Sequence, residues 1–247
     1  MKTLFATLCL LFLATSASAG ALVDVQVVEQ ASGRVLETWR HHGRYYVVGT
    51  PGERYAVLIR NRTGARVLTV LSVDGVNAVS GQTAATSQSG YVLAPWQSTE
   101  VAGWRKNLDE VAAFYFTSLG DSYASRTGRP RNVGVIGVAV FREYEPPRPR
   151  FEELEQKDGA AAPMPGAARM EAQKSRAAEE KLGTGHGERL PSQVGTTEFR
   201  RASEAPAEIV SLYYDSRANL EAQGIIPTRR PRHPQPFPGG FVPDPTR

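Results

Sequence analysis

The chain has 247 residues, of which 41% are hydrophobic and 22% charged, so it is long enough to bury the core of one domain. The formal net charge is only +4, and the basic residues are scattered along the chain instead of gathered in a stripe, which argues against a nucleic-acid partner. The single cysteine, Cys9, excludes a disulfide within the chain and a metal held by several cysteines.

The first 19 residues have the pattern of a secretory signal peptide. Lys2 supplies the positive charge, residues 4–14 form an apolar run, and Ala17 and Ala19 occupy the small-residue positions before a cleavage site. The run is shorter than the roughly 20 apolar residues that a membrane-spanning helix needs. We therefore predict that the mature chain begins at Gly20, contains no cysteine, has no stable membrane insertion, and is periplasmic or secreted.

Residues 20–143 have the pattern of short strands separated by turns. Val23 to Val27 alternates apolar and polar residues, as a half-buried strand does. The β-branched runs 55–60 and 67–73 flank a turn-forming segment and predict one hairpin, and Asp74-Gly75 predicts a second. Further strands are expected at residues 76–79, 91–93, 99–102, 112–117 and 133–142, the last of them apolar enough for a central strand. The series predicts an all-β fold, a β-sandwich of the jelly-roll or immunoglobulin-like kind.

The remaining residues divide into three segments. Residues 144–182 are rich in proline, charge and alanine without an apolar stripe, and this composition predicts a flexible linker. Residues 183–226 contain a strand candidate at 209–214 and one or two helical turns at 217–223. This segment is too small to fold alone, so we expect it to complete the β domain by pairing along an edge. Residues 227–247 are proline-rich and predict a disordered tail.

Several phrases of the chain resemble a family of secreted bacterial proteins whose members are labelled uncharacterised. The phrases occur in the order VDG, GYVL-x-P, GWR and AAF-x-F, followed after a gap by KLGTGHGER. The resemblance covers residues 55–143 and 182–226. It implies an exported β-sandwich domain with a variable linker, and it supplies no catalytic or binding residue to transfer.

Motifs of known catalytic chemistry are absent from the sequence. It contains no G-x-S-x-G, no H-E-x-x-H, no phosphate-binding loop and no dinucleotide fingerprint. His41 and His42 are interpreted as a polar turn before Gly43, because neighbouring strand residues point to opposite faces. His186 lies between two glycines, in a loop that either presents a base or ligand, or simply docks the returning segment. Asp74 is explained by its turn. We therefore predict no catalytic residue, no metal site and no cofactor.

The aromatic residues leave two alternatives open, a surface platform and a filled core. The span GYVLAPWQSTEVAGWR, residues 90–105, contains Tyr91, Trp96 and Trp104. Exposed tryptophans grip sugar rings or partner proteins, whereas a chain without disulfides needs large side chains inside. Trp104 follows a strand and a glycine, so we expect it in the core with Arg105 over its face. Trp96 follows Pro95 in a loop and is the better surface candidate.

These observations predict a non-enzymatic binding or scaffolding module of the cell envelope. Its candidate binding residues are Trp96, Tyr91 and His186, and its expected partner is an envelope protein or a glycan. One alternative is a secreted hydrolase that uses His186 and a carboxylate. Another is an envelope assembly factor that acts by adding a strand to a partner. The sequence leaves the ligand and the oligomeric state open.

Overall fold

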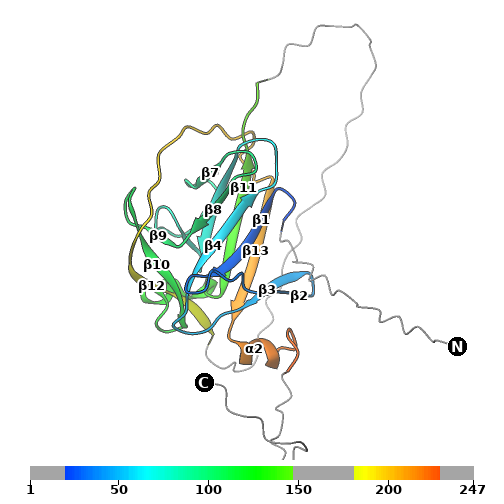
Figure 1. The fold of residues 1–247 in the computed structure, drawn as a ribbon, viewed down its shortest axis with the longest axis vertical. Helices are drawn as coiled ribbons and strands as arrows, with labels where there is room; N and C mark the ends of the chain where they lie inside the picture. The colour runs from blue at the N-terminus through cyan, green and yellow to red at the C-terminus, as the bar shows by residue number, and fades with distance from the viewer. Residues whose placement is uncertain (1–19, 147–180, 229–247) are drawn as a thin grey trace, which may run out of the picture.

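A computed structural model of the chain describes residues 20–146 and 181–228 (Figure 1). The predicted signal peptide of residues 1–19 lies outside the described residues. So do all but the ends of the predicted linker of residues 144–182 and all but the first residues of the predicted tail of residues 227–247.

The described elements are mainly short strands. In chain order they are β1 (Val23–Glu29), β2 (Thr38–His41), β3 (Arg44–Val48), β4 (Arg54–Asn61), β5 (Val67–Val73), β6 (Val76–Asn77), β7 (Tyr91–Leu93), β8 (Ser98–Val101), β9 (Gly103–Arg105), β10 (Glu110–Ser118), α1 (Tyr123–Arg126), η1 (Pro130–Asn132), β11 (Val135–Arg142), β12 (Leu182–Pro191), β13 (Glu208–Asp215) and α2 (Arg217–Ala222).

The strands form two sheets. The first has the order β1-β4-β10-β12, with β8 paired to β4 and β9 paired to β10. The second has the order β2-β3-β13-β11-β5-β6, with β7 paired to β5. Neighbouring strands are antiparallel, apart from the parallel pair β3 and β13. The prediction of an all-β sandwich is confirmed.

The core lies between the two sheets, because side chains of both contribute to one buried cluster. Val57, Ile59 and Phe114 come from the first sheet, and Leu71 and Leu212 come from the second. The alternation expected for the first strand is present, since β1 buries every second side chain along most of its length. Burial of these apolar side chains is the main term that stabilises a fold of this kind.

One predicted hairpin is wrong and the other is confirmed. β4 and β5 do not pair with each other, because β4 lies in the first sheet and β5 in the second. Asn61 holds the corner between the sheets: its side-chain oxygen accepts from Thr63 N at 2.9 Å, and its amide group donates to Ala65 O and Ala94 O, both at 2.8 Å. The Asp74-Gly75 turn does join β5 to β6, with both residues at positive φ.

The segment 182–215 contributes a strand to each sheet. β12 pairs with β10 at the edge of the first sheet, whereas β13 lies inside the second sheet between β11 and β3. The expectation that this segment closes only an edge is therefore wrong for β13, because the sequence cannot show that β3 supplies a second neighbour. The predicted helical turns are present as α2.

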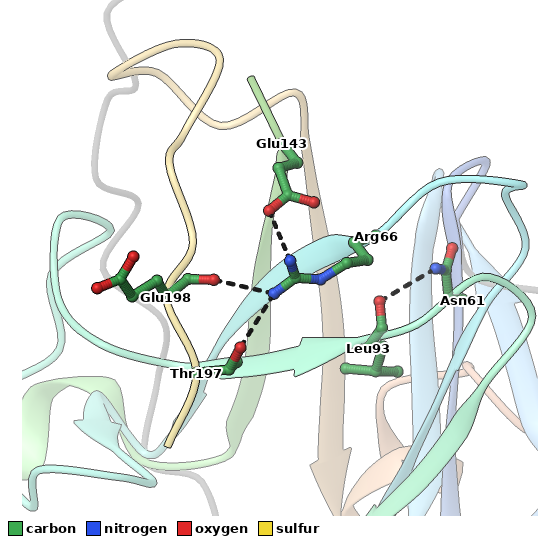
Figure 2. A network of polar contacts seen from close by, with 6 residues as sticks. All are labelled: Asn61, Arg66, Leu93, Glu143, Thr197 and Glu198. Atoms are coloured by element: carbon green, nitrogen blue, oxygen red, sulfur yellow. Dashed lines mark hydrogen bonds and ion pairs between the residues drawn. The ribbon is translucent and has the colours of Figure 1, made fainter. Parts of the chain in front are cut away.

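A polar network fastens the connection between β12 and β13 to the second sheet (Figure 2). Arg66, just before β5, donates to Glu143 Oε1 at 2.9 Å, to Glu198 O at 2.9 Å and to Thr197 Oγ1 at 3.3 Å. Figure 2 shows the guanidinium group between β11's end and the chain that carries Thr197 and Glu198. In the same view, the Asn61 amide lies 3.5 Å from Leu93 O.

Candidate functional site

A groove lined by several cations lies at the end of β13, where Figure 1 shows β3 and α2 nearby. Its cavity volume is about 430 Å³. Its walls come from β3, β13, the start of β12, the segment from η1 to β11, and α2 with the residue that follows it. We call it the basic groove, because three cations line it: Arg44, Arg131 and Lys181.

These three cations lie at the surface of the described part of the chain. None of them forms an ion pair with a carboxylate among the described residues, and Arg131 and Lys181 are exposed. Arg44 lies over the ring of Tyr213, 5.5 Å from its centroid. Tyr46 is the register partner of Tyr213, and the two rings lie 5.6 Å apart at an angle of 33°. The groove therefore combines a tilted pair of aromatic rings with a positive rim.

Asp215 is the single carboxylate among the residues that line the groove, and it already accepts hydrogen bonds from neighbouring groups. Its Oδ1 atom accepts from Ser216 N at 2.7 Å, from the Asn219 amide group at 2.8 Å and from Leu182 N at 3.3 Å. These contacts tie β13, the start of α2 and the start of β12 together. The groove has a net positive charge because three cations and one carboxylate line it.

Behind the groove, Asp74 is completely buried at the turn between β5 and β6. Its carboxylate accepts from Gly134 N at 2.9 Å, from Thr184 N at 2.8 Å and from the Tyr214 hydroxyl at 2.5 Å. The Tyr214 hydroxyl lies 2.6 Å from Thr184 Oγ1, which lies 2.5 Å from the Tyr55 hydroxyl. Each hydroxyl has one proton, so with Tyr214 donating to Asp74 the chain of donors runs from Tyr55 through Thr184 and Tyr214 to Asp74.

Burial is the largest influence on the pKa values of Asp74, Tyr55 and Tyr214 in this row of hydrogen-bonded side chains. It raises the pKa of Asp74 to about 6, although the bonds from Tyr214, Thr184 and Gly134 act in the opposite direction. Burial and the nearby Asp74 charge raise the pKa of both Tyr55 and Tyr214 well above the ordinary tyrosine value. No solvent-filled space beside the Asp74 carboxylate would admit a substrate, because the side chain is wholly enclosed. The hydrogen bonds of Asp74 have a structural role, because they join the turn between β5 and β6 to β12 and β13.

His186 lies on β12 and not in a glycine-rich turn, so that part of the sequence interpretation is wrong. The glycines of this strand allow close packing instead: a Cβ atom on Gly185 would come within 2.1 Å of the Tyr115 ring. The His186 ring stacks near Trp104, at 6.2 Å and 10°, and near Tyr123, at 5.2 Å.

Among the described residues, no carboxylate lines the hollow beside His186, although the hydrolase alternative requires one. The hollow beside it is lined by Tyr123, Arg126 and Thr127. Burial, helped by the positive charges of Lys106 and Arg126, lowers the pKa of His186. The described neighbours of the imidazole are cations and aromatic rings, and none of those lining the hollow is a carboxylate that would orient it as a general base.

Trp96 is exposed, as expected, with 66% of its surface open to solvent. Gln97 N donates to Ala94 O at 3.1 Å, and Trp96 has a φ of 61°. With Pro95 before it, Trp96 stands at the third position of a turn, where glycine is normally preferred because that position needs a positive φ. A bulky residue in this conformation that gains no burial is a candidate for contact with something outside the fold.

Tyr91 and Trp104 belong to the interior. Trp104 is 2% exposed and packs edge-to-face on Phe114, with 4.7 Å between ring centroids, which confirms its place in the core. Arg105 lies over Tyr91 at 5.8 Å and not over Trp104, which corrects the expected pairing. Tyr91 is half-buried against the core, and its burial raises its pKa.

The three predicted binding residues do not form one site. No ring contact joins Tyr91, Trp96 and His186 to each other within the described part of the chain. Leu93, just before the Trp96 turn, pairs with Val67, the first residue of β5. The basic groove is lined by Val135, whose neighbour Ile136 pairs with Val73, the last residue of β5. The Trp96 turn and the basic groove therefore lie at opposite ends of the sandwich, about 20 Å apart by the rise of a strand.

Sequence reasoning missed the basic groove, because its residues are far apart along the chain. The pairs Arg44-Tyr45 and Tyr213-Tyr214 carry no spacing that indicates a shared site. The predicted turn at His41-His42 is confirmed, since His42 and Gly43 both have positive φ between β2 and β3. That hairpin places Arg44 and Tyr46 beside β13.

Within residues 20–146 and 181–228, no three histidine, cysteine or acidic side chains gather closely enough to hold a metal ion. No helix of these residues is long and apolar enough to cross a membrane. Comparisons of the chain with protein-family models, with curated proteins and with solved structures found no match. The site's own geometry is therefore the basis for a functional conclusion.

Proposed function

We propose that the chain is an exported, non-enzymatic binding module of the cell envelope, whose basic groove takes an acidic glycan. One observation carries the proposal: three cations without carboxylate partners among the described residues border a groove that contains a pair of tyrosine rings. Arginine pairs with carboxylates in a fixed fork geometry, and aromatic rings pack well on the apolar faces of sugars.

The placement of the ionisable groups favours binding over hydrolysis. Hydrolysis of a glycosidic bond requires two carboxyl groups that face a substrate from opposite sides, about 5 to 9.5 Å apart. In the basic groove, Asp215 is the single carboxylate of the lining, and it is held by three N–H donors. Asp74 is enclosed behind the wall.

The test is a binding titration of the chain from Gly20 to Arg247 with an oligogalacturonate and with a neutral oligosaccharide of the same length. We expect the acidic oligomer alone to bind, with an affinity that falls as salt is raised from about 50 to 200 mM, because ions screen the contact. Arg44→Ala combined with Arg131→Ala should weaken binding by at least about tenfold, the loss that 1.4 kcal/mol represents.

Arg34→Ala is the matched control, since Arg34 is an exposed cation whose partner is Glu29 on the edge strand β1. It removes a positive charge without touching the groove, and binding should stay within about twofold of the unchanged protein. Equal binding of the neutral and acidic oligomers, or equal losses for Arg34→Ala and the groove variants, would contradict the proposed function.

A further inference from the structure

The beginning of the described chain is held by one acidic side chain. Glu208, the first residue of β13, accepts hydrogen bonds from the backbone N–H groups of Ala21, Leu22 at 2.7 Å and Val23 at 3.3 Å. Consecutive N–H groups that converge in this way form a small anion-binding concavity. A single carboxylate of the second sheet thus holds the residues that lead into β1 of the first sheet.

Gly20 lies against the same carboxylate in a conformation that needs glycine. Its φ is 125°, and a Cβ atom at this position would come within 2.2 Å of Val23 O and 3.3 Å of Glu208 Oε1. A hollow of about 240 Å³ borders it, lined also by Glu208 and Arg44. The sequence before Gly20 has the pattern of a signal-peptide cleavage site, with Ala17 and Ala19 at the small-residue positions.

We propose that hydrolysis of the Ala19–Gly20 peptide bond makes Gly20 the amino terminus, and that Glu208 binds the α-ammonium group so formed. In that reaction, catalysed by a signal peptidase, water adds its hydroxyl group to the Ala19 carbonyl carbon. The nitrogen of Gly20 receives the hydrogen and takes up one further proton at neutral pH. The inference rests on the proposed export of the chain but not on the ligand of the basic groove.

The chemistry of the new terminus suits its surroundings. Cleavage replaces one neutral amide donor by a cation with up to three N–H donors, and charge-assisted bonds to a carboxylate are about twice as strong as neutral ones. Other charged groups nearby are Arg62, whose Nη1 lies 3.5 Å from Gly20 O, and Arg44 across the hollow. Both are cations, and Asp24 on β1 is a further carboxylate close along the chain. Glu208 lines the same hollow as Gly20, so it is the group that would attract the ammonium. Removal of the signal peptide would then strengthen the contact between β13 and the start of β1.

The test compares two full chains, one that begins at Gly20 and one that begins at Ala17, each with Glu208 or with Glu208→Gln. A tag protease that leaves glycine as the first residue produces the first chain. At pH 6 we expect the Gly20 chain to have a melting temperature about 2 to 4 °C above that of the Ala17 chain. Glutamine has no charge and keeps one accepting oxygen, while its amide nitrogen cannot accept an N–H bond, so it weakens the contact with residues 21–23 in both chains alike. The difference between the two chains depends on the charge, so Glu208→Gln should abolish it.

The pH dependence has a defined direction. A carboxylate partner raises the pKa of an α-amino group above its unfolded value of about 8, so the stabilisation is complete below that pH and is lost as pH rises through the folded pKa. The two melting temperatures should therefore converge near pH 10. A difference that persists in Glu208→Gln or at pH 10, or no difference at pH 6, overturns the contact.

Processing is tested separately by sequencing the amino terminus of protein recovered from the envelope of expressing cells. A first residue of Gly20 supports the inference, and retention of residues before Gly20 on protein from the envelope overturns the processing step. Because the melting experiment uses purified chains, it distinguishes a failure of the Glu208 contact from a failure of export. Binding of the acidic oligosaccharide is a third, independent readout.

Discussion

Two tryptophans of one short span meet opposite environments. Trp104 is fixed by its neighbours on β10 and β12, and its ring contributes large apolar area to the core. Trp96 has 66% of its surface exposed and sits in a turn position that glycine would occupy at no steric cost. Packing in the core explains the position of Trp104, but it does not explain the exposed ring and positive φ of Trp96. Trp96 is therefore a second candidate for external contact, remote from the basic groove.

This contrast predicts different costs for the two side chains. Trp104→Ala should lower the free energy of unfolding by about 3 to 5 kcal/mol, because it leaves a cavity in the core. Trp96→Ala should change it by no more than about 0.5 kcal/mol, since most of the ring surface is exposed. Trp96→Gly should leave it unchanged or raise it, because glycine adopts the positive φ of this position without strain. Urea unfolding followed by circular dichroism measures all three. A loss of 2 kcal/mol or more for Trp96→Ala would show that this ring packs on the fold.

At the scale of elements, β13 is the strand whose placement most affects the rest. It separates β3 from β11, so the β2–β3 hairpin joins the second sheet only through it. Its two faces differ: Leu212 and Tyr214 are buried between the sheets, whereas Ile209 is 61% exposed on the outer face. The sequence suggests burial for Ile209 as well, because it is apolar, but the alternation of strand side chains turns it outward.

Substitutions on the two faces of β13 should separate this way. Leu212→Ala should cost about 2 to 4 kcal/mol of unfolding free energy, through lost burial and the cavity that remains. Ile209→Ala is the matched control on the same strand, and it should cost less than about 1 kcal/mol. Urea titration monitored by circular dichroism provides both values. Equal costs would mean that the outer face of β13 is covered by some other part of the protein.

For the molecule as a whole, a row of buried, hydrogen-bonded side chains that ends at Asp74 joins the two sheets across the core. Asp74 and Tyr214 belong to the second sheet and its turn, and Thr184 and Tyr55 belong to the first. Buried polar groups of this kind are stabilising only when every donor has an acceptor. This row of side chains meets that condition. Each hydroxyl donates to the next group in the row, and both oxygens of the Asp74 carboxylate accept hydrogen bonds.

The ionisation of Asp74 predicts how stability depends on pH. Its folded pKa of about 6 lies above the ordinary value of 3.8, so the folded state binds the proton more tightly. The contribution of Asp74 to stability is therefore complete below about pH 4 and is lost as pH rises through 6. A shift of this size corresponds to about 3 kcal/mol.

Asp74→Asn isolates this contribution, because asparagine tolerates the positive φ of the turn and does not titrate. The unfolding free energy of the unchanged protein minus that of Asp74→Asn should grow by about 2 to 2.5 kcal/mol between pH 7 and pH 4. The other titrating groups are common to both proteins and cancel in this difference. A difference that is constant or that shrinks on acidification would show that Asp74 is not the group that titrates.

The sequence alone was sufficient where the signal is local. Alternating side chains predict β1, the Asp74-Gly75 pair predicts the turn between β5 and β6, and a continuous apolar run predicts the central strand β11. These features depend on backbone preferences and side-chain periods of a few residues, which the chain carries without its neighbours. The burial of Trp104 was also predictable, because it follows a strand and a glycine, whereas the sequence made Trp96 only the better surface candidate and left its exposure open.

The tertiary structure alone decided which strands are neighbours. The segment 54–73 has the local pattern of a hairpin, yet β4 and β5 enter different sheets, because pairing with β1 and β10 and with β11 buries both inner faces. For the same reason, the sequence could not show that Arg44, Arg131 and Lys181 meet at one groove, or that Glu208 reaches the N–H groups of residues 21–23. Such contacts join residues far apart in the chain, and their energy depends on burial and distance, which exist only after the sheets have packed.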